Sequence, residues 1–219
     1  MGREIDLLKR YPKSNRDLSK RLQSKSDESR EIARRFDKEF FDGSRENGYG
    51  GFTYNPKYWT DVVQDLIFEY GLTKNSSVLD IGCAKGYFLH DLKLAIPGIT
   101  LCGIDISEYA INNSIETVRQ DVRIANAKEL PFKDDSFDLV ISINTVHNLD
   151  ITECAKAIKE IERVSKGYAF ITVDAYRTEL ERERMEAWNL TAKTIMSCDE
   201  WKIFFKEIGY TGDYYWFIP

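Results

Sequence analysis

Residues 78–86 read VLDIGCAKG, and this short stretch decides the fold. Apolar, β-forming residues lead to Asp80, and two glycines, Gly82 and Gly86, follow closely. A strand that ends in an acid and turns through glycines is typical of a strand–loop–helix unit whose backbone contacts a ligand. The next helix offers unpaired N–H groups and the positive end of its dipole. We expect a ligand here, but one that brings a positive group or hydroxyls to Asp80, because an acid repels phosphate.

Strand and helix patterns alternate after this stretch, and a helix with one apolar face precedes it from Pro56 to Gly71. Expected strands cover 76–81, 99–106, 121–127, 136–143, 168–175 and 213–218, and expected helices cover 86–96, 107–118, 152–164, 178–196 and 198–208. This alternation predicts an α/β fold, a doubly wound and mostly parallel sheet of six or seven strands with helices on both faces. Ligands of such sheets bind beyond the carboxyl ends of the strands, where the strand order reverses.

The start of the chain has a different composition. Residues 1–35 carry eleven Lys or Arg and six Asp or Glu, although the net charge of the chain is -5. One helix is expected over 26–41, with Ser26 as its cap and a narrow apolar stripe. The stripe consists of Ile32, Phe36 and Phe40. We expect residues 1–54 to form an N-terminal helical extension and lid, and residues 55–219 to form the ligand-binding domain.

Composition narrows the class of protein. The chain has 219 residues, 42% of them hydrophobic, which suits one well-buried domain. No apolar run of about 18 residues is present, so no membrane span is expected. The N-terminus lacks the apolar core of a secretory signal. The four cysteines are far apart and form no CxxC pair, which favours reduced thiols in a cytoplasmic protein and gives no zinc-ligand pattern.

The second expected strand also ends in an acid, Asp105, about twenty residues after the glycine loop. An acid at this position can accept both hydrogens of a ribose diol. Ala84 and Tyr87 occupy the later glycine positions of the GxGxxG fingerprint, and no P-loop is present. The pattern therefore indicates a nucleoside with a free ribose, and it argues against both NAD-linked oxidoreductases and nucleoside triphosphates.

The motifs LDIGCAKG, GIDIS and NAKELPFKDDSFDLVISINTVHNL resemble the first four motifs of class I S-adenosylmethionine-dependent methyltransferases. They come in the family's order and spacing, over about residues 55–175. The resemblance implies a Rossmann-like methyltransferase fold with S-adenosyl-L-methionine as cofactor. The cofactor-binding residues that it implies, with Tyr54 added from the lid, are Asp80, Gly82, Cys83, Ala84, Gly86, Asp105, Ile106, Asn126, Ala127 and Asn144.

Three departures from the family pattern stand out. Ala84 replaces the family's central glycine, and Asn126 replaces the acid after the third strand. Only one strand follows the last helix, where the family usually has a terminal hairpin. We therefore expect either a sheet that is one strand short or an edge covered by a partner or by the N-terminal arm.

Two residues at the mouth of the expected site could carry chemistry. His147, just past the fourth core strand, is the candidate base, and Asp174 could orient a base or bind a hydroxyl. Asn144 and Asp174 together offer too few oxygens for a metal site, so no metal is expected. The other histidine, His90, is expected to face solvent.

Candidate residues that contact the methyl acceptor are Tyr49, Tyr176 and Arg177. The chain is also similar to uncharacterised methyltransferases of bacterial surface-glycan gene clusters, which implies a sugar or another small-molecule precursor, methylated on oxygen or nitrogen. The acidic chain argues against nucleic acid, although a nucleic-acid methyltransferase and a non-catalytic cofactor-binding protein stay open. Either a monomer or a homodimer is compatible with the sequence.

Overall fold

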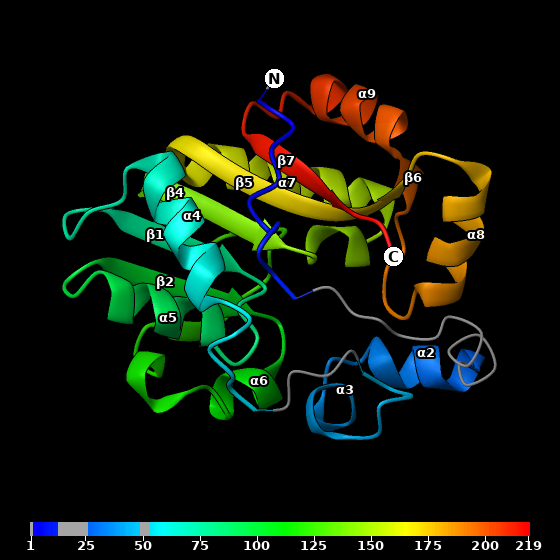
Figure 1. The fold of residues 1–219 in the computed structure, drawn as a ribbon, viewed down its shortest axis with the longest axis horizontal. Helices are drawn as coiled ribbons and strands as arrows, with labels where there is room; N and C mark the ends of the chain where they lie inside the picture. The colour runs from blue at the N-terminus through cyan, green and yellow to red at the C-terminus, as the bar shows by residue number, and fades with distance from the viewer. Residues whose placement is uncertain (1, 13–25, 49–52) are drawn as a thin grey trace.

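The structure is a computed structural model, and it describes residues 2–12, 26–48 and 53–219 (Figure 1). Seven strands form one sheet in the order β3-β2-β1-β4-β5-β6, and β7 also pairs with β5. The strands are β1 (Ser77–Ile81), β2 (Thr100–Asp105), β3 (Val122–Ile124), β4 (Phe137–Ile143), β5 (Ser165–Tyr176), β6 (Met196–Ser197) and β7 (Asp213–Phe217). All pairings between them are parallel. The predicted doubly wound α/β sheet is confirmed.

Helices cover both faces of the sheet, and the core is correspondingly divided in two. Along β1, Val78 packs with the α4 and α5 side, whereas Leu79 packs with the α7 and α9 side. This alternation follows from the two-residue period of a strand. The helices are α4 (Thr60–Tyr70), α5 (Tyr87–Ala95), α6 (Glu108–Asn112), α7 (Ile151–Val164), α8 (Glu179–Trp188) and α9 (Cys198–Ile208), with the 3-10 turns η1 (Glu116–Val118) and η2 (Val146–Asn148). Among the described residues, no helix is both long and apolar enough to cross a bilayer.

The strand order places the switch point between β1 and β4. β1 pairs with β2 on one side and with β4 on the other, so the chain crosses to opposite halves of the sheet at this point. The segments that follow β1, β2, β4 and β5 therefore meet at one edge, at the carboxyl ends of the strands. In Figure 1, α8 follows β5 beyond this edge, and α2 and α3 lie between α8 and α6.

The N-terminal extension contains two helices where the sequence predicted one. α2 (Asp27–Ala33) begins at the expected cap, Ser26, whose side chain accepts from Ser29 N. Phe36 then adopts a left-handed backbone with φ of 50°, which ends the helical path. The side chain of Asp37 caps the next helix, α3 (Lys38–Asp42), by accepting from Glu39 N. A local cap has therefore overridden the apolar periodicity.

Two other predicted helices are shorter than expected, and asparagine side chains explain both ends. Asn113 Nδ2 donates to Tyr109 O at 2.8 Å, so α6 stops there and residues 116–118 form a separate turn. Asn189 binds both the N–H and the carbonyl of Ala192, which ends α8 well before the predicted boundary. The chain then forms β6, a two-residue strand that the sequence did not predict. Asparagine competes with helical hydrogen bonding in this way.

The first residues of the chain complete the edge of the sheet. Ile5 N donates to Tyr214 O, and Tyr214 N donates to Arg3 O, each at 3.0 Å. Arg3 also forms an ion pair with Asp213 at the start of β7, and Leu7 is buried in the core at 3% exposure. The sequence left open whether a partner or the N-terminal arm covers the edge of the sheet. The structure shows that the N-terminal arm covers the β7 edge. Residues 2–12 lie on the core, apart from α2 and α3.

This packing leaves no room for a side chain at Gly2. A Cβ there would lie 2.0 Å from Gly212 O, on the segment that leads into β7. Gly2→Ala should therefore displace the arm and lower stability by about 1–3 kcal/mol, as overpacking does. A thermal melt measures this, with exposed Lys9→Ala as the control on the same segment. A Gly2→Ala midpoint equal to that of the control would contradict the arm's placement.

Candidate functional site

The loop after β1 is built from left-handed backbone. Gly82, Ala84 and Gly86 have φ values of 83°, 49° and 76°. A Cβ on Gly82 would lie 2.1 Å from Thr145 Oγ1, and one on Gly86 would lie 2.7 Å from Val118 Cγ2. The turn thus requires glycine as predicted. At both glycines the neighbouring side chain occupies the place that a Cβ would take, so the loop packs tightly against the segments after β4 and α6.

Asp80 lies at the carboxyl end of β1 and is only 5% exposed. No residue in the described part of the chain donates a hydrogen bond to its carboxylate. Burial, together with the neighbouring Asp105, raises the pKa of Asp80 to about 8. A buried carboxylate without a donor is costly unless a cation or a donor arrives. The geometry therefore provides a receptor for a positively charged group.

Asp105 ends β2 and holds the two neighbouring loops. Its two oxygens accept from Ala84 N at 2.9 Å and from Ser107 N at 2.8 Å. Burial raises the pKa of Asp105, and these backbone donors act in the opposite direction. Each carboxylate oxygen has a second lone pair, so Asp105 can also accept two hydroxyls. It can therefore fix the glycine loop and bind a diol at once.

The N-terminus of α5 lies beside both acids. Gly86 is its N-cap residue, and no side chain caps the helix. The first-turn N–H groups and the positive end of the helix dipole can accept an anion. A ligand with an ammonium group, a carboxylate and a diol would thus find three complementary partners around this loop.

Strands β3 and β4 contribute the remaining cofactor candidates. Asn144 follows β4 with a left-handed φ of 52°, and its side chain accepts from Thr172 Oγ1 at 2.9 Å. A strained backbone that neighbours hold in place is common at functional sites. Asn126 follows β3 and accepts from Lys128 N, while Ala127 packs against the core. Ile106, next to Asp105, leaves its side chain 58% exposed.

The two catalytic candidates, His147 and Asp174, are brought into contact. His147 is 3% exposed, and its Nδ1 accepts from Asp174 N at 3.0 Å. The proton of the neutral ring therefore resides on Nε2, which lies 3.7 Å from Asp174 Oδ1. Burial lowers the pKa of His147, and the Asp174 carboxylate only partly opposes this. His147 is thus a neutral ring that positions the end of β5.

This contact gives a stability prediction. His147→Leu leaves the Asp174 N–H without its acceptor and should cost about 1–3 kcal/mol at pH 7.5. The wild type should lose stability as the pH falls below 6.5, the ordinary value for histidine, because the unfolded chain then binds a proton that folded His147 does not. Urea unfolding at pH 7.5 and 5.5 measures both effects, and His147→Leu should show the shallower pH dependence. An equally steep dependence in the variant would contradict this assignment.

Three predicted contacts, Tyr54, Tyr176 and Arg177, lie on segments outside the glycine loop. Tyr54 donates to Asp91 on the side of α5, with its ring 5.8 Å from that of Tyr87. Tyr176 ends β5 beside β6, and Arg177 pairs with Glu4 of the N-terminal arm at 3.7 Å. Tyr49 lies outside the described residues.

His90 was expected to face solvent, and this is wrong. Its ring is buried on α5, where Nδ1 lies 2.5 Å from Thr117 Oγ1 and Tyr54 contacts its edge. The turn η1 packs over the face of α5 that carries His90. The sequence pattern did not indicate this packing.

The four cysteines are buried and unpaired. Cys83, within the glycine loop, has its pKa raised by burial and by the acids Asp80 and Asp105. A thiol of this kind is a packing residue rather than a nucleophile. Within residues 2–12, 26–48 and 53–219, no three His, Cys, Asp or Glu side chains are grouped as metal ligands would be.

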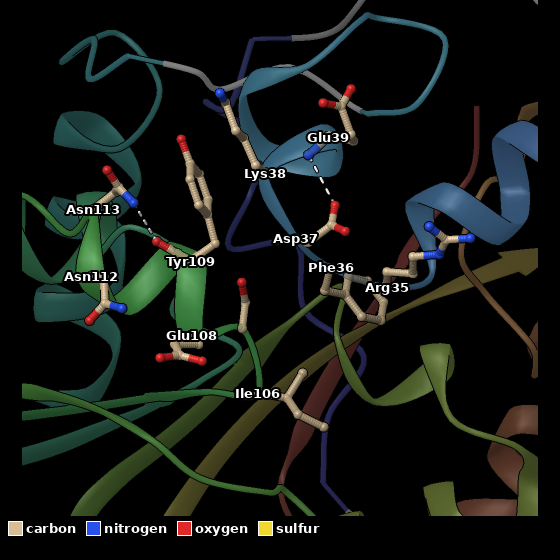
Figure 2. Close-up of a pocket in the computed structure, with 11 residues that line it drawn as sticks. Arg35, Phe36, Asp37, Lys38, Glu39, Ile106, Glu108, Tyr109, Asn112 and Asn113 are labelled. Atoms are coloured by element: carbon tan, nitrogen blue, oxygen red, sulfur yellow. Dashed lines mark hydrogen bonds between the residues drawn. The ribbon is translucent and has the colours of Figure 1, made fainter.

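The structure adds two features that the sequence did not single out. A cavity of about 720 Å³ lies between the extension and the start of α6 (Figure 2). Its lining comes from the α2–α3 connection and from the segment after Asp105, and consists of Arg35, Phe36, Asp37, Lys38, Glu39, Ile106, Ser107, Glu108, Tyr109, Asn112 and Asn113. Lys85 of the glycine loop is 5% exposed and pairs with Asp42 of α3. The sequence signal for the Lys85–Asp42 contact was weak, because it consisted of a lysine placed between Ala84 and Gly86 of the glycine loop.

Comparisons with known proteins agree with the geometry. A family model described as a methyltransferase domain matches residues 72–216, which is most of the chain. The match begins before β1 and ends in β7, so it contains both acids, the glycine loop and the His147–Asp174 pair.

Curated relatives match over part of their length. An uncharacterized protein of Haemophilus influenzae is 30% identical over 66% of this chain and 62% of that protein. The mitochondrial arginine-hydroxylase NDUFAF5 of Rattus norvegicus is 36% identical over 48% of this chain and 29% of its own. The tRNA (carboxymethyluridine(34)-5-O)-methyltransferase of Arabidopsis thaliana is 31% identical over 61% and 32%. The chain thus spans less than two thirds of each of these relatives.

A solved structure supports the fold over nearly the whole chain. A SAM-dependent methyltransferase from Aquifex aeolicus is 20% identical, with a TM-score of 0.50 and 89% coverage of both chains. At this identity the likeness concerns the fold alone.

Proposed function

This chain belongs to the methyltransferase-domain family, and from that premise we propose that it transfers a methyl group to an oxygen or nitrogen of a small molecule. S-adenosylmethionine is the cofactor of this domain. When bound, it supplies an electrophilic methyl group on a sulfonium sulfur. The residues described above have the chemistry to hold it.

One observation carries the proposal, namely the buried Asp80 carboxylate and the half-buried Asp105 carboxylate at the ends of neighbouring strands. Asp80 lacks a donor in the described chain and suits the ammonium group of the cofactor. Asp105 keeps lone pairs for the two ribose hydroxyls. The uncapped N-terminus of α5 suits the cofactor's carboxylate. We assign the adenine to the space beside Ile106 and the segment of Asn126 and Ala127.

We assign the acceptor side of the site to Asn144 and to the His147–Asp174 pair. Methyl transfer requires nucleophile, methyl and sulfur in line, so positioning supplies much of the acceleration. For an acceptor that carries a proton, Asp174 is the proposed proton acceptor, because His147 Nδ1 already accepts the Asp174 N–H. His147 then acts as a positioning residue. This refines the earlier hypothesis that His147 itself is the base.

A small-molecule acceptor is favoured by the charge near the site. α8 follows β5 beyond the carboxyl edge and carries four Glu and two Arg. A phosphate backbone normally requires an extended positive surface. Within this class we propose a sugar or sugar precursor, on the sequence resemblance alone. The unpaired cysteines favour a reducing compartment such as the cytoplasm.

A tRNA acceptor is the second candidate. The observation that favours it is the similarity to the Arabidopsis tRNA methyltransferase, together with the basic balance of residues 1–35. One relative is named as an arginine-hydroxylase, and it suggests a third candidate, namely a protein that binds the cofactor but transfers no methyl group.

A coupled assay for S-adenosylhomocysteine release tests these candidates. Separate pools of sugar nucleotides, sugar phosphates, amino compounds and total tRNA serve as acceptors, with Asp80→Asn as the inactive control. Turnover with a small-molecule pool is expected. Turnover with tRNA alone would replace the proposal with the second candidate, and cofactor binding by calorimetry without turnover in any pool would overturn the catalytic assignment.

A further inference from the structure

We propose that the N-terminal extension contributes half of the adenosine site, with Phe36 as an aromatic surface facing Ile106 and with the Asp42–Lys85 pair holding it in place. This inference rests on the proposed function. It assigns a role to residues outside the region that the family model matches, and it accounts for three features that the core alone leaves unexplained.

The first feature is the position of the cavity. It begins at Ile106 and Ser107, immediately after the acid that can bind a ribose diol. Phe36 and Ile106, from segments far apart in the sequence, both line the cavity (Figure 2). Ile106 is 58% exposed although it lies beside a buried strand. The volume of about 720 Å³ is ample for a nucleoside.

The second feature is the backbone of Phe36. Its φ of 50° is a left-handed conformation, which is strained for a bulky residue. The strain places an aromatic residue at the break between α2 and α3, where its ring packs edge-on against Phe40 at 5.3 Å. An aromatic face beside an exposed isoleucine is a suitable surround for a flat, apolar base.

The third feature is how the extension is attached. Lys85 Nζ donates to both Asp42 oxygens, at 2.5 and 2.7 Å, and Tyr109 OH donates to Asp42 Oδ2 at 2.7 Å. Lys85 directly follows Ala84, the residue whose N–H is held by Asp105. The extension is therefore joined to the same loop that surrounds the cofactor. Asp42 and Lys85 are positioning residues in this arrangement.

The charges around the cavity favour a neutral base over a phosphate. Two cations and three carboxylates line it, and they come from both the extension and α6. These are Arg35 and Lys38, and Asp37, Glu39 and Glu108. Because the positive and negative charges nearly cancel, the cavity has no excess positive charge to attract a phosphate dianion. The amide side chains of Asn112 and Asn113 can form hydrogen bonds with the edge of a base.

Calorimetry with two probes tests the proposal. S-adenosylhomocysteine carries the amino acid half, and 5′-methylthioadenosine lacks it. Phe36→Ala should weaken both ligands equally, by about 10-fold, as loss of a stacked aromatic does. Phe36→Tyr should restore binding. The control, Phe68→Ala, removes an aromatic residue that is exposed on α4 and lies outside the cavity lining, and it should bind as wild type does.

The positioning role has its own readout. Asp42→Asn should also weaken both probes, and adding Phe36→Ala to it should have little further effect, because the aromatic surface is then already displaced. If the affinity losses of the two single variants added up in the double variant, Asp42 would not act by positioning Phe36. Wild-type affinity in both single variants would overturn the inference and leave the proposed function intact. Failure of the wild type to bind either probe would overturn the proposed function itself.

Discussion

Asp80→Asn is expected to lower the affinity for S-adenosylmethionine by at least about 100-fold, the scale for removing one partner of a buried charge pair. The carboxylate is buried at the end of β1 without a donor in the described chain. An asparagine has nearly the same shape but no charge to offer the cofactor's ammonium group. Calorimetry measures the effect. Asp138→Asn is the matched control and should bind the cofactor normally. Asp138 lies at the amino end of β4, whereas Asp80 lies at the carboxyl end of β1, and Asp138 accepts a hydrogen bond from Ser77 N.

The same residue should set the pH dependence of binding. Because the pKa of Asp80 is raised to about 8, the carboxylate is mostly protonated at pH 6 in the free protein. An ammonium ligand requires the ionised form, so affinity should rise by up to about tenfold per pH unit between pH 6 and 8. Binding of 5′-methylthioadenosine, which lacks the ammonium group, should stay level over this range. A level profile for the full cofactor would contradict the pairing of Asp80 with a cation.

Stability should respond in the opposite direction. The folded state holds a proton on Asp80 that the unfolded chain releases near its ordinary value of 3.8, so this group's contribution to stability falls as the pH rises from 3.8 to about 8. The ligand-free Asp80→Asn variant should consequently unfold at a higher urea concentration than the wild type at pH 8. A lower midpoint would mean that Asp80 has a partner that stabilises its charge. Active sites commonly sacrifice stability in this way.

The loop and its two acids could be predicted because their signals are local. Asp80, Gly82 and Gly86 are close in sequence, and the β2 acid follows at a spacing set by one strand–helix–strand unit. The doubly wound sheet follows from the same alternation. The left-handed backbone at Gly82 and Gly86 agrees with what such a loop requires.

The rest of the site depends on contacts between distant segments. Nothing near Asp42 indicates that it pairs with Lys85, and nothing near Arg3 indicates that it lies beside Asp213. The apolar stripe through Phe36 even predicted the wrong path, since the cap at Asp37 competes successfully with helical periodicity. Burial of His147 and its contact with Asp174 required the packing of η2 against β5. Such features arise from tertiary packing rather than from local pattern.

Asp105→Ala should have an effect as large as that of Asp80→Asn, but with a different ligand profile. The substitution removes the acceptor for two ribose hydroxyls and for the N–H groups of Ala84 and Ser107. Hydrogen bonds to a charged group contribute about 1.5–3 kcal/mol each, so losing two to the ligand corresponds to a loss of at least about 100-fold.

The ligand profile separates the two acids. Asp105→Ala should weaken binding of both S-adenosylhomocysteine and 5′-methylthioadenosine by this factor, because both carry the ribose diol. Asp80→Asn should weaken only the first, because only the first carries the ammonium group. The control, Asp121→Ala, removes an acid of the same kind outside the site and should change the affinity for neither ligand. Asp121 directly precedes β3 and forms an ion pair with Lys93. If 5′-methylthioadenosine bound to Asp105→Ala as tightly as to the wild type, the diol would lie elsewhere, and the proposed direction of the cofactor across the β1–β2 edge would have to be reversed.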